Sequence, residues 1–343
     1  MRRSRPEPRP TGSTQLHQLD RVSFDAGLRG SRPGGRRTVG GMPAALRAIA
    51  PDAAEAEVAA ALTAVRAVDE ACHAGDGAGV LDEAAHLRLA HDGLAGARLW
   101  LATDAEEPVG FALLTGESLD LAVAPTARRA GTGTALAAAA VAEAGPRLLA
   151  WSHVDHPGAA SLARQHDLHA VRELLVMARP ATDLPAPPER DDVRVRAYDP
   201  AAPGDAADLL RINAAAFAHH PEQGAMDADD LARRTAQDWF DPAGLLLAVD
   251  AATGATLGFH WTKIEPAVAD GGTTGEVYVV GVAPEAQGRG LGKLLTLAGL
   301  HHLADRGVTE IELYVEGDNH PARAVYAGLG FEVVATHVQY ARG

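Results

Sequence analysis

The feature that most constrains this sequence is an internal repeat. Residues 123–133 and residues 282–292 both begin with Val-Ala-Pro, both end in Gly-x-Gly, and align without a gap. Two further pairs recur in the same order, namely Gly110-Phe111 with Gly258-Phe259 and Asp155-His-Pro with Asn319-His-Pro. The pattern predicts a tandem duplication, in which two copies of one folding unit follow each other along the chain.

The length of the chain suits two folding units. Its 343 residues are enough for two domains that each bury a core. We expect a disordered basic tail, or a start codon assigned too early, at 1–41, an N-terminal domain at 42–180, a proline-rich linker at 181–192, and a C-terminal domain at 193–343. Helical and β-rich patterns alternate in both domains, which predicts an α/β fold with a mixed, largely antiparallel twisted sheet flanked by helices.

The patterns also predict where the helices and strands lie. In the N-terminal domain we expect helices at 52–71 and 82–89, a helix ending near 144 and one beginning near 156, and strands at 97–102, 108–114, 118–123, 147–151 and 171–177. In the C-terminal domain we expect strands at 193–197, 245–249, 256–264, 276–282, 310–315 and 331–340, and helices at 206–217, 227–238, 291–305 and 321–329.

Charge and cysteine content disfavour several classes of function. The net charge is −14, although residues 1–41 carry nine Arg against Glu7, Asp20 and Asp25. The rest of the chain is therefore strongly acidic, which disfavours binding to nucleic acid or to an anionic membrane. The one cysteine, Cys72, permits no intramolecular disulfide and no cysteine-based metal cluster. We expect a cytoplasmic monomer without a metal.

A glycine-rich turn marks a binding site in the second copy. The β-rich run at 276–282 leads directly into this turn, and an apolar helix pattern begins near Leu291. A helix N-terminus carries unpaired N–H groups, and Gly288, Gly290 and Gly292 let an anion approach that backbone. The dinucleotide motif G-x-G-x-x-G and the P-loop motif are both absent here. We therefore favour a site for a diphosphate over a plain strand-turn-helix connection.

The turn resembles the acyl-CoA signature of the GCN5-related N-acetyltransferases (the GNAT superfamily). The spacing is Gln287-x-x-Gly290-x-Gly292, and the first copy keeps it as Arg128, Gly131 and Gly133. The resemblance implies that the loop amides hold the pyrophosphate of acetyl-CoA. It also implies that the preceding strand splays away from its neighbour, so that its backbone binds the pantetheine arm and the thioester.

Two side chains in the second copy suit acyl transfer to an amine. The amine must lose a proton, and Glu276, which begins the strand before the turn, is a carboxylate able to accept it directly or through water. The alternative for Glu276 is an exposed charge at a strand edge. The GNAT resemblance implies that Tyr326 protonates the departing CoA thiolate and that Asn319 approaches the pantetheine arm, whereas the alternative for Tyr326 is a core aromatic. We expect the Val282 amide to polarise the thioester carbonyl.

The two copies differ where chemistry would occur. The first copy has Leu162 at the position of Tyr326, and Arg129 replaces Gly288, which adds positive charge but removes flexibility. We therefore expect the C-terminal domain to be catalytic and the N-terminal domain to be non-catalytic. Whether the N-terminal domain binds acetyl-CoA stays open at this point.

Further stretches resemble the mycothiol synthases of actinobacteria, a tandem-domain family within the GNAT superfamily. These stretches are residues 217–224, which include His-Pro-Glu-Gln-Gly, Thr262-Lys263, residues 276–282 and residues 313–319. The resemblance covers residues 42–343. It implies direct transfer, in a ternary complex, of an acetyl group from acetyl-CoA to the cysteinyl amine of the pseudodisaccharide Cys-GlcN-Ins (desacetylmycothiol), which gives mycothiol and CoA.

The same resemblance implies the residues of each site. Contacts to the amino-sugar, inositol or cysteine parts would come from Glu83, Glu222, Lys263, Glu276 and Tyr314. Contacts to acetyl-CoA in the C-terminal domain would come from Val280, Gly281, Val282, Gln287, Gly288, Arg289, Gly290, Leu291, Gly292, Lys293, Asn319, His320, Pro321, Ala322, Arg323 and Ala324. In the N-terminal domain they would come from Leu121, Ala122, Val123, Arg129, Ala130, Gly131, Thr132, Gly133 and Thr134. Two alternatives remain, namely a GNAT enzyme for another small amine or a protein N-terminus, and an acyl-CoA-binding protein without turnover.

Overall fold

The computed structural model describes residues 44–343, apart from 77–78, 82, 219–222 and 265–272. The N-terminal half contains β1 (Ala45–Ile49), α1 (Glu55–Asp76), α2 (Glu83–His91), β2 (Ala97–Asp104), β3 (Glu107–Thr115), β4 (Ser118–Val123), α3 (Thr132–Glu143), β5 (Leu149–Ser152), α4 (Pro157–Gln165) and β6 (Leu168–Pro180). The C-terminal half contains β7 (Val193–Ala197), α5 (Pro203–Ala216), α6 (Ala228–Thr235), β8 (Leu245–Asp250), β9 (Thr256–Ile264), β10 (Thr274–Val282), α7 (Leu291–Asp305), β11 (Glu310–Glu316), α8 (His320–Gly328) and β12 (Glu332–Arg342). The fold is α/β, with a mostly antiparallel sheet.

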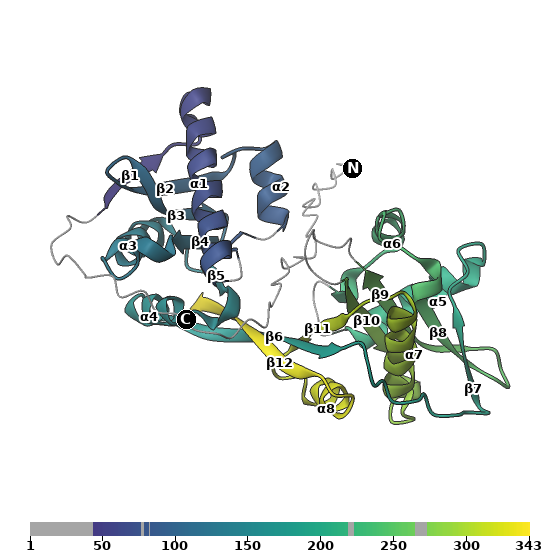
Figure 1. Ribbon diagram of the computed structural model, residues 1–343. Coiled ribbons are helices and arrows are strands. Elements are labelled where there is room, and N and C mark those ends of the chain that lie inside the picture. Colours follow the sequence, from purple (N-terminus) through teal and green to yellow (C-terminus); the bar gives the residue numbers. More distant parts are fainter. Residues whose placement is uncertain (1–43, 77–78, 82, 219–222, 265–272) are drawn as a thin grey trace, which may run out of the picture.

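The strands of both halves form one sheet. Its order is β1-β2-β3-β4-β5-β12-β6-β11-β10-β9-β8-β7. β6 pairs antiparallel with β11 on one side and with β12 on the other, and β12 also pairs with β5. The last strand of each half therefore lies against strands of the other half. Figure 1 shows β6 and β12 side by side where the two halves meet.

Helices cover both faces of the N-terminal strands. Leu99 and Leu101 of β2 belong to the apolar cluster formed with α1. Trp100 and Ala102, which alternate with them, belong to the cluster formed with α3. Because successive side chains of a strand point to opposite faces, this alternation buries β2 on both sides.

The C-terminal strands also have two covered faces. On β9, the ring of His260 lies against α7, with its Nδ1 at 2.8 Å from the Leu295 carbonyl oxygen. Trp261, the next residue, points the opposite way and packs against Trp239 and Phe240, which follow α6. We call the side of the sheet with His260 the α7 face, and the side with Trp261 the α6 face.

Most of the expected elements are confirmed, and β4, β7, β9 and α7 have the expected bounds. β1 was not expected, because its five residues are mostly exposed and show no apolar alternation. Among the described strands it pairs with β2. α1 continues past Ala71 to Asp76. β6 is longer than the expected 171–177 because strands from the other half pair with it along both edges. The expected tail at 1–41 lies outside the described residues.

Candidate functional site

Neighbouring strands separate in each half. β10 runs to Val282, but its parallel pairing with β11 spans only Thr274 to Glu276. In the N-terminal half, β4 and β5 pair only through Ser118 and Leu119 of β4. The Ala283 N–H donates to the Leu257 carbonyl on the β9 side, so the Val282 N–H, one residue earlier, points to the side from which β11 has diverged. The separated strand end can thus offer backbone groups to an extended ligand.

The glycine loop after β10 suits an anion. Gly288 and Gly290 have φ of 76° and 74°, values that residues with a Cβ rarely adopt. Gly290 is the N-cap of α7, and no side chain caps this helix. A Cβ added at Gly288, Gly290 or Gly292 would meet no atom within 4 Å. An open, uncapped helix N-terminus fits the pyrophosphate of acetyl-CoA.

The loop after β4 has the same backbone conformation. Arg129, at the position of Gly288, has a φ of 68°, and Gly131, at the position of Gly290, has a φ of 88°. Gly131 is the N-cap of α3, and no side chain caps that helix either. The exchange of Gly288 for Arg129 therefore leaves the left-handed loop conformation in place.

Arg128 connects the loop after β4 to other residues of the N-terminal half. Its guanidinium donates to both oxygens of Asp76 at 2.8 and 2.5 Å, and its Nε donates to the Val123 carbonyl at 2.8 Å. Arg128 accordingly holds the pKa of Asp76 below its usual value. A Cβ at Gly133 would lie 3.6 Å from Leu162 of α4, whereas nothing lies within 4 Å at Gly292. The first copy is therefore more closely filled around its loop than the second.

Glu276 lies on the α6 face. It is the register partner of Lys263 on β9, so the two side chains share one face of the sheet. The Lys263 side chain is buried, with its Nζ 5.4 Å from the Trp239 ring centroid and 6.0 Å from that of Tyr278. Burial raises the pKa of the Tyr278 hydroxyl, which accepts a hydrogen bond from Arg234 at 2.9 Å. This face combines carboxylate, buried cation and aromatic rings, which suits a polar acceptor that carries an amine.

A β-bulge in β10 determines which residue of this strand lies opposite Lys263 on the α6 face. The register with β9 shifts between Val277 and Val279, so Tyr278 is the extra residue. The register of β4 with β3 has no such shift, and Ser118 there lies opposite Thr115. Gly110 of β3 corresponds to Gly258 of β9. Five residues after these glycines, Thr115 pairs with Ser118 and Lys263 pairs with Glu276, so Ser118 is the structural counterpart of Glu276.

Glu117 shows the effect of this shift on the N-terminal half. An ungapped alignment matches Glu117 with Glu276. In the structure Glu117 precedes β4 and forms an ion pair with Arg147 at 2.6 Å. The N-terminal half thus has a serine where the C-terminal half has a carboxylate.

Tyr326 lies on the other side of the sheet from Glu276. It packs, together with Val280 of β10, against an apolar cluster on the α7 face that includes Leu297 and Leu300 of α7. Its ring meets Phe331 edge to face, with centroids 5.9 Å apart. Burial raises the pKa of Tyr326 to about 12, so its hydroxyl stays protonated at neutral pH and can donate a proton.

The remaining expected site residues are placed as follows. Tyr314 alternates on β11 with Leu313 and Val315, which belong to the α7-face cluster, so Tyr314 lies on the α6 face with Glu276. Its ring stacks on His337 of β12, with centroids 6.3 Å apart. Asn319 is exposed and caps α8 by accepting a hydrogen bond from the Ala322 N–H at 3.2 Å. Glu83 begins α2, and Glu222 lies outside the described residues.

Sequence reasoning missed some residues of the α6 face. Glu312 is the register partner of Glu276 on β11 and is only 6% exposed. Trp239 and Tyr278 surround the Lys263 ammonium. The signal for Glu312 was present, because the strand Glu310–Glu316 alternates polar and apolar residues and so places Glu312 and Tyr314 on one face.

Comparison with known proteins agrees with this geometry. The family model described as "Acetyltransferase (GNAT) family" matches residues 208–331. The GCN5-related N-acetyltransferase from Sphaerobacter thermophilus superposes with a TM-score of 0.60 at 24% identity, over 87% of this chain and 94% of that chain. A tandem GNAT protein from the clavulanic acid biosynthesis pathway superposes with a TM-score of 0.51 at 22% identity, over 72% and 83%. The fold and the site define a GNAT-type acetyltransferase, a class of enzymes that uses acetyl-CoA.

Relatives of higher identity narrow the class. A mycothiol acetyltransferase from Nocardioides sp. is 55% identical over 82% of this chain and 97% of its own length. The mycothiol acetyltransferases of Rhodococcus jostii and Mycolicibacterium smegmatis are 45% and 44% identical, over 81% and 84% of this chain and 93% and 95% of their own. The chain belongs to the mycothiol acetyltransferase family.

Among the described residues, no helix is long and apolar enough to cross a membrane. In the same part of the chain, no group of three or more His, Cys, Asp or Glu residues is arranged to hold a metal ion.

Proposed function

We propose that the C-terminal half transfers the acetyl group of acetyl-CoA to the cysteinyl amine of Cys-GlcN-Ins, giving mycothiol and CoA. The observation that carries this proposal is the arrangement around the separated end of β10. Glu276 lies on one face of the sheet and Tyr326 on the other, with the glycine loop at the end of the same strand. An amine arriving on the α6 face and a thioester lying along the separated strand would meet between these two groups, which supports direct transfer in a ternary complex.

In this mechanism Glu276 acts first. Its carboxylate takes a proton from the cysteinyl ammonium, directly or through water, and the free amine attacks the thioester carbonyl carbon. As the new C–N bond forms, negative charge develops on the carbonyl oxygen. The Val282 N–H points away from β9 and would stabilise that charge.

Tyr326 completes the transfer. The C–S bond breaks, the electron pair goes to sulfur, and the tyrosine hydroxyl gives its proton to the CoA thiolate. The raised pKa of about 12 keeps this hydroxyl protonated until it is needed. As the C–S bond breaks, the nitrogen of the new amide loses its second proton to water. The cycle closes when the Glu276 carboxylic acid releases its proton to solvent and the tyrosinate regains one, so that one proton is released in each turnover.

Side chains on the α6 face would bind the acceptor. Lys263 and Tyr314, together with Glu276, would bind the hydroxyls and the amine of the acceptor. By family resemblance, Glu83 and Glu222 would add carboxylates to the same acceptor. For acetyl-CoA, we assign residues 280–282, 287–293 and 319–324.

We also propose the halves at 42–180 and 193–343 as the two domains, joined by the linker at 181–192, with the N-terminal domain non-catalytic. Ser118 and Leu162 stand where the C-terminal half has Glu276 and Tyr326, which supports this assignment. The N-terminal loop, through residues 121–123 and 129–134, would bind a non-reacting acetyl-CoA. Native mass spectrometry that counts bound CoA per chain tests this point, and a ratio of one would reject it.

A transfer assay with purified protein tests the catalytic roles. With acetyl-CoA and Cys-GlcN-Ins, Glu276→Gln and Tyr326→Phe should each lower kcat by about 10²-fold or more, as expected for lost proton transfer. Glu117→Gln, in the N-terminal half, is the matched control and should leave kcat unchanged. Unchanged turnover in both C-terminal variants would reject the assigned roles, and preference for another amine in a substrate panel would reject the acceptor.

A further inference from the structure

The glycine loop of the C-terminal half is attached to the linker. The linker, residues 181–192, contains no helix or strand, yet it is fixed to the C-terminal half at several points. The Ala181 N–H donates to the Thr309 carbonyl at 3.0 Å, and His301 Nε2 of α7 lies 3.0 Å from the Pro185 carbonyl oxygen. The linker is therefore docked on this half along its length.

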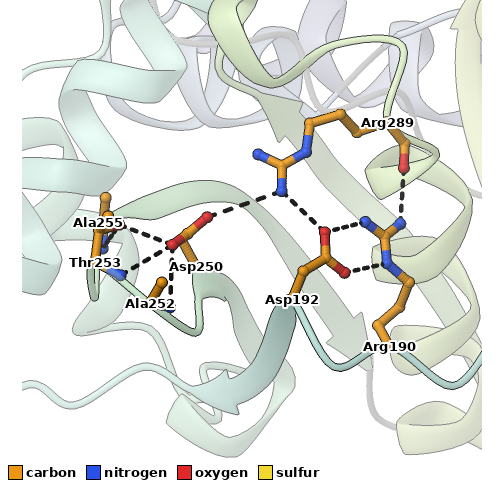
Figure 2. Close-up of polar contacts among 7 residues, drawn as sticks. All are labelled: Arg190, Asp192, Asp250, Ala252, Thr253, Ala255 and Arg289. Carbon is orange, nitrogen blue, oxygen red and sulfur yellow. Dashed lines mark hydrogen bonds and ion pairs between the residues drawn. The ribbon is translucent and has the colours of Figure 1, made fainter.

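The end of the linker forms a polar network with the glycine loop, shown in Figure 2. Arg190 donates to both oxygens of Asp192 at 2.7 and 2.6 Å, and its Nη1 donates to the Arg289 carbonyl at 2.8 Å. The Arg289 guanidinium donates in turn to Asp192 at 3.1 Å and lies 3.8 Å from Asp250. Arg289 is thus held through its main chain and through its side chain.

The two carboxylates in this network are themselves fixed. The Ala251 N–H donates to the Asp192 carbonyl at 2.9 Å, and the next residue, Val193, pairs with Asp250 in the β7–β8 ladder. Asp250 accepts hydrogen bonds from the Thr253 and Ala252 N–H groups at 2.9 and 3.2 Å. Arg190, with a smaller effect of Arg289, holds the pKa of Asp192 well below its usual value. Asp192 therefore remains a charged, fixed point at neutral pH.

The contact to the Arg289 carbonyl matters because a peptide unit is planar. In a trans peptide the C=O and the following N–H point in opposite directions. By holding the Arg289 carbonyl, Arg190 fixes the direction of the Gly290 N–H at the N-cap of α7. Gly288 and Gly290 have the widest backbone freedom of any residue type, so contacts from outside the loop are needed to hold it in one conformation.

We propose that Arg190 and Asp192 are positioning residues that hold the glycine loop ready for the pyrophosphate of acetyl-CoA. This inference rests on the proposed binding of acetyl-CoA by the C-terminal half. The first loop is held differently, because Arg128 ties it to β4 and α1 of the same half. The linker is thus part of the cosubstrate site in the second copy alone.

Isothermal titration of the full-length protein with CoA, without an acceptor, tests the proposal. Arg190→Ala should weaken CoA binding about three- to ten-fold, as expected for the loss of charge-assisted hydrogen bonds at a partly exposed site. The matched control is Arg194→Ala, because Arg194 is exposed on the adjoining strand β7 and its loss changes the net charge equally. This control should bind CoA within about two-fold of wild type.

Asp192→Asn separates positioning from simple charge attraction. If charge alone matters, removal of a negative charge near an anionic ligand should tighten CoA binding. If positioning matters, loss of the two hydrogen bonds from Arg190 to the Asp192 carboxylate should weaken CoA binding. Weaker CoA binding in Asp192→Asn and Arg190→Ala, with unchanged melting temperature and unchanged KM for the amine, supports the proposal.

Two results would overturn the proposal. One is CoA binding by Asp192→Asn that equals or exceeds wild type, and the other is an equal effect of Arg190→Ala and Arg194→Ala. A wild-type protein that binds no CoA at all would instead reject the proposed function together with this inference, so the two failures are distinguishable.

Discussion

At the scale of single residues, the two halves differ at the two positions to which we assign proton transfer. Tyr326 on α8 is a hydroxyl donor, while Leu162 takes the corresponding place on α4. Glu276 on β10 is a carboxylate, while Ser118 takes its place on β4. Neither change disturbs the loop backbone, which has nearly the same φ values in both halves. The loop backbone is therefore conserved between the halves, although the side chains at these two positions differ.

The pKa of Tyr326 predicts the pH profile of the enzyme. Because burial raises this pKa to about 12, from about 10 in water, the hydroxyl remains protonated while pH rises through 10. We therefore expect no falling limb in kcat between about pH 8 and pH 10. Tyr326→Phe should lower kcat across this range without changing the shape of the profile. CoA release, followed over pH, measures it, and a falling limb near pH 9 that disappears in Tyr326→Phe would contradict the assignment.

At the scale of elements, α7 contributes both to the glycine loop and to the packing of the sheet. Its N-terminus presents the glycine loop, and its middle packs on β9. Gly299 allows this packing, because a Cβ there would collide with the ring of His260, which is fully buried. The position of the loop therefore depends on a glycine about two and a half helical turns away from it.

Gly299→Ala tests this packing. Alanine is the better helix former by about 1 kcal/mol, yet overpacking costs about 1–3 kcal/mol, and we expect a net loss of stability. The control is Gly204→Ala on the exposed surface of α5, where a Cβ meets no atom within 4 Å. Urea unfolding measures both variants. Equal stability of Gly299→Ala and Gly204→Ala would show that α7 can shift to admit the methyl group.

How far the sequence could predict these elements depends on the element. Apolar periodicity and the glycine turn predicted β4, β9 and α7 with their observed bounds. The bulge at Tyr278 was not predictable, because an extra residue in one strand is evident only from its pairing with the next strand. An ungapped alignment therefore matches Glu276 with Glu117 instead of Ser118. Likewise, the left-handed conformation of Arg129 contradicts its local preference and is imposed by the loop around it.

At the scale of the whole molecule, the duplicated halves are joined by more than the linker. Among the described strands, β6 of the N-terminal half pairs with β11 and β12, both from the C-terminal half, and β12 lies between β5 and β6. The repeat predicted two units, but it did not predict this arrangement, because a strand carries no sequence mark of which copy will pair with it. We therefore expect the two halves to unfold together.

Cleavage of the linker tests this cooperation. A protease site placed at residues 186–187 should yield fragments that stay associated in gel filtration, because separation would expose both edges of β6. The cleaved protein should also melt in one transition, and we expect the same of the uncut protein with the same insertion, which is the control. Fragments that elute separately, or two melting transitions, would contradict the expectation.

The shared sheet also has a consequence for synthesis on the ribosome. β6 is complete at Pro180, but both of its partner strands, β11 and β12, are translated only after α7. Until then its backbone hydrogen-bonding groups and its buried side chains have no native partners, a condition that favours aggregation. β12 pairs with both β5 and β6, so the N-terminal half reaches its native structure only after β12 has left the ribosome.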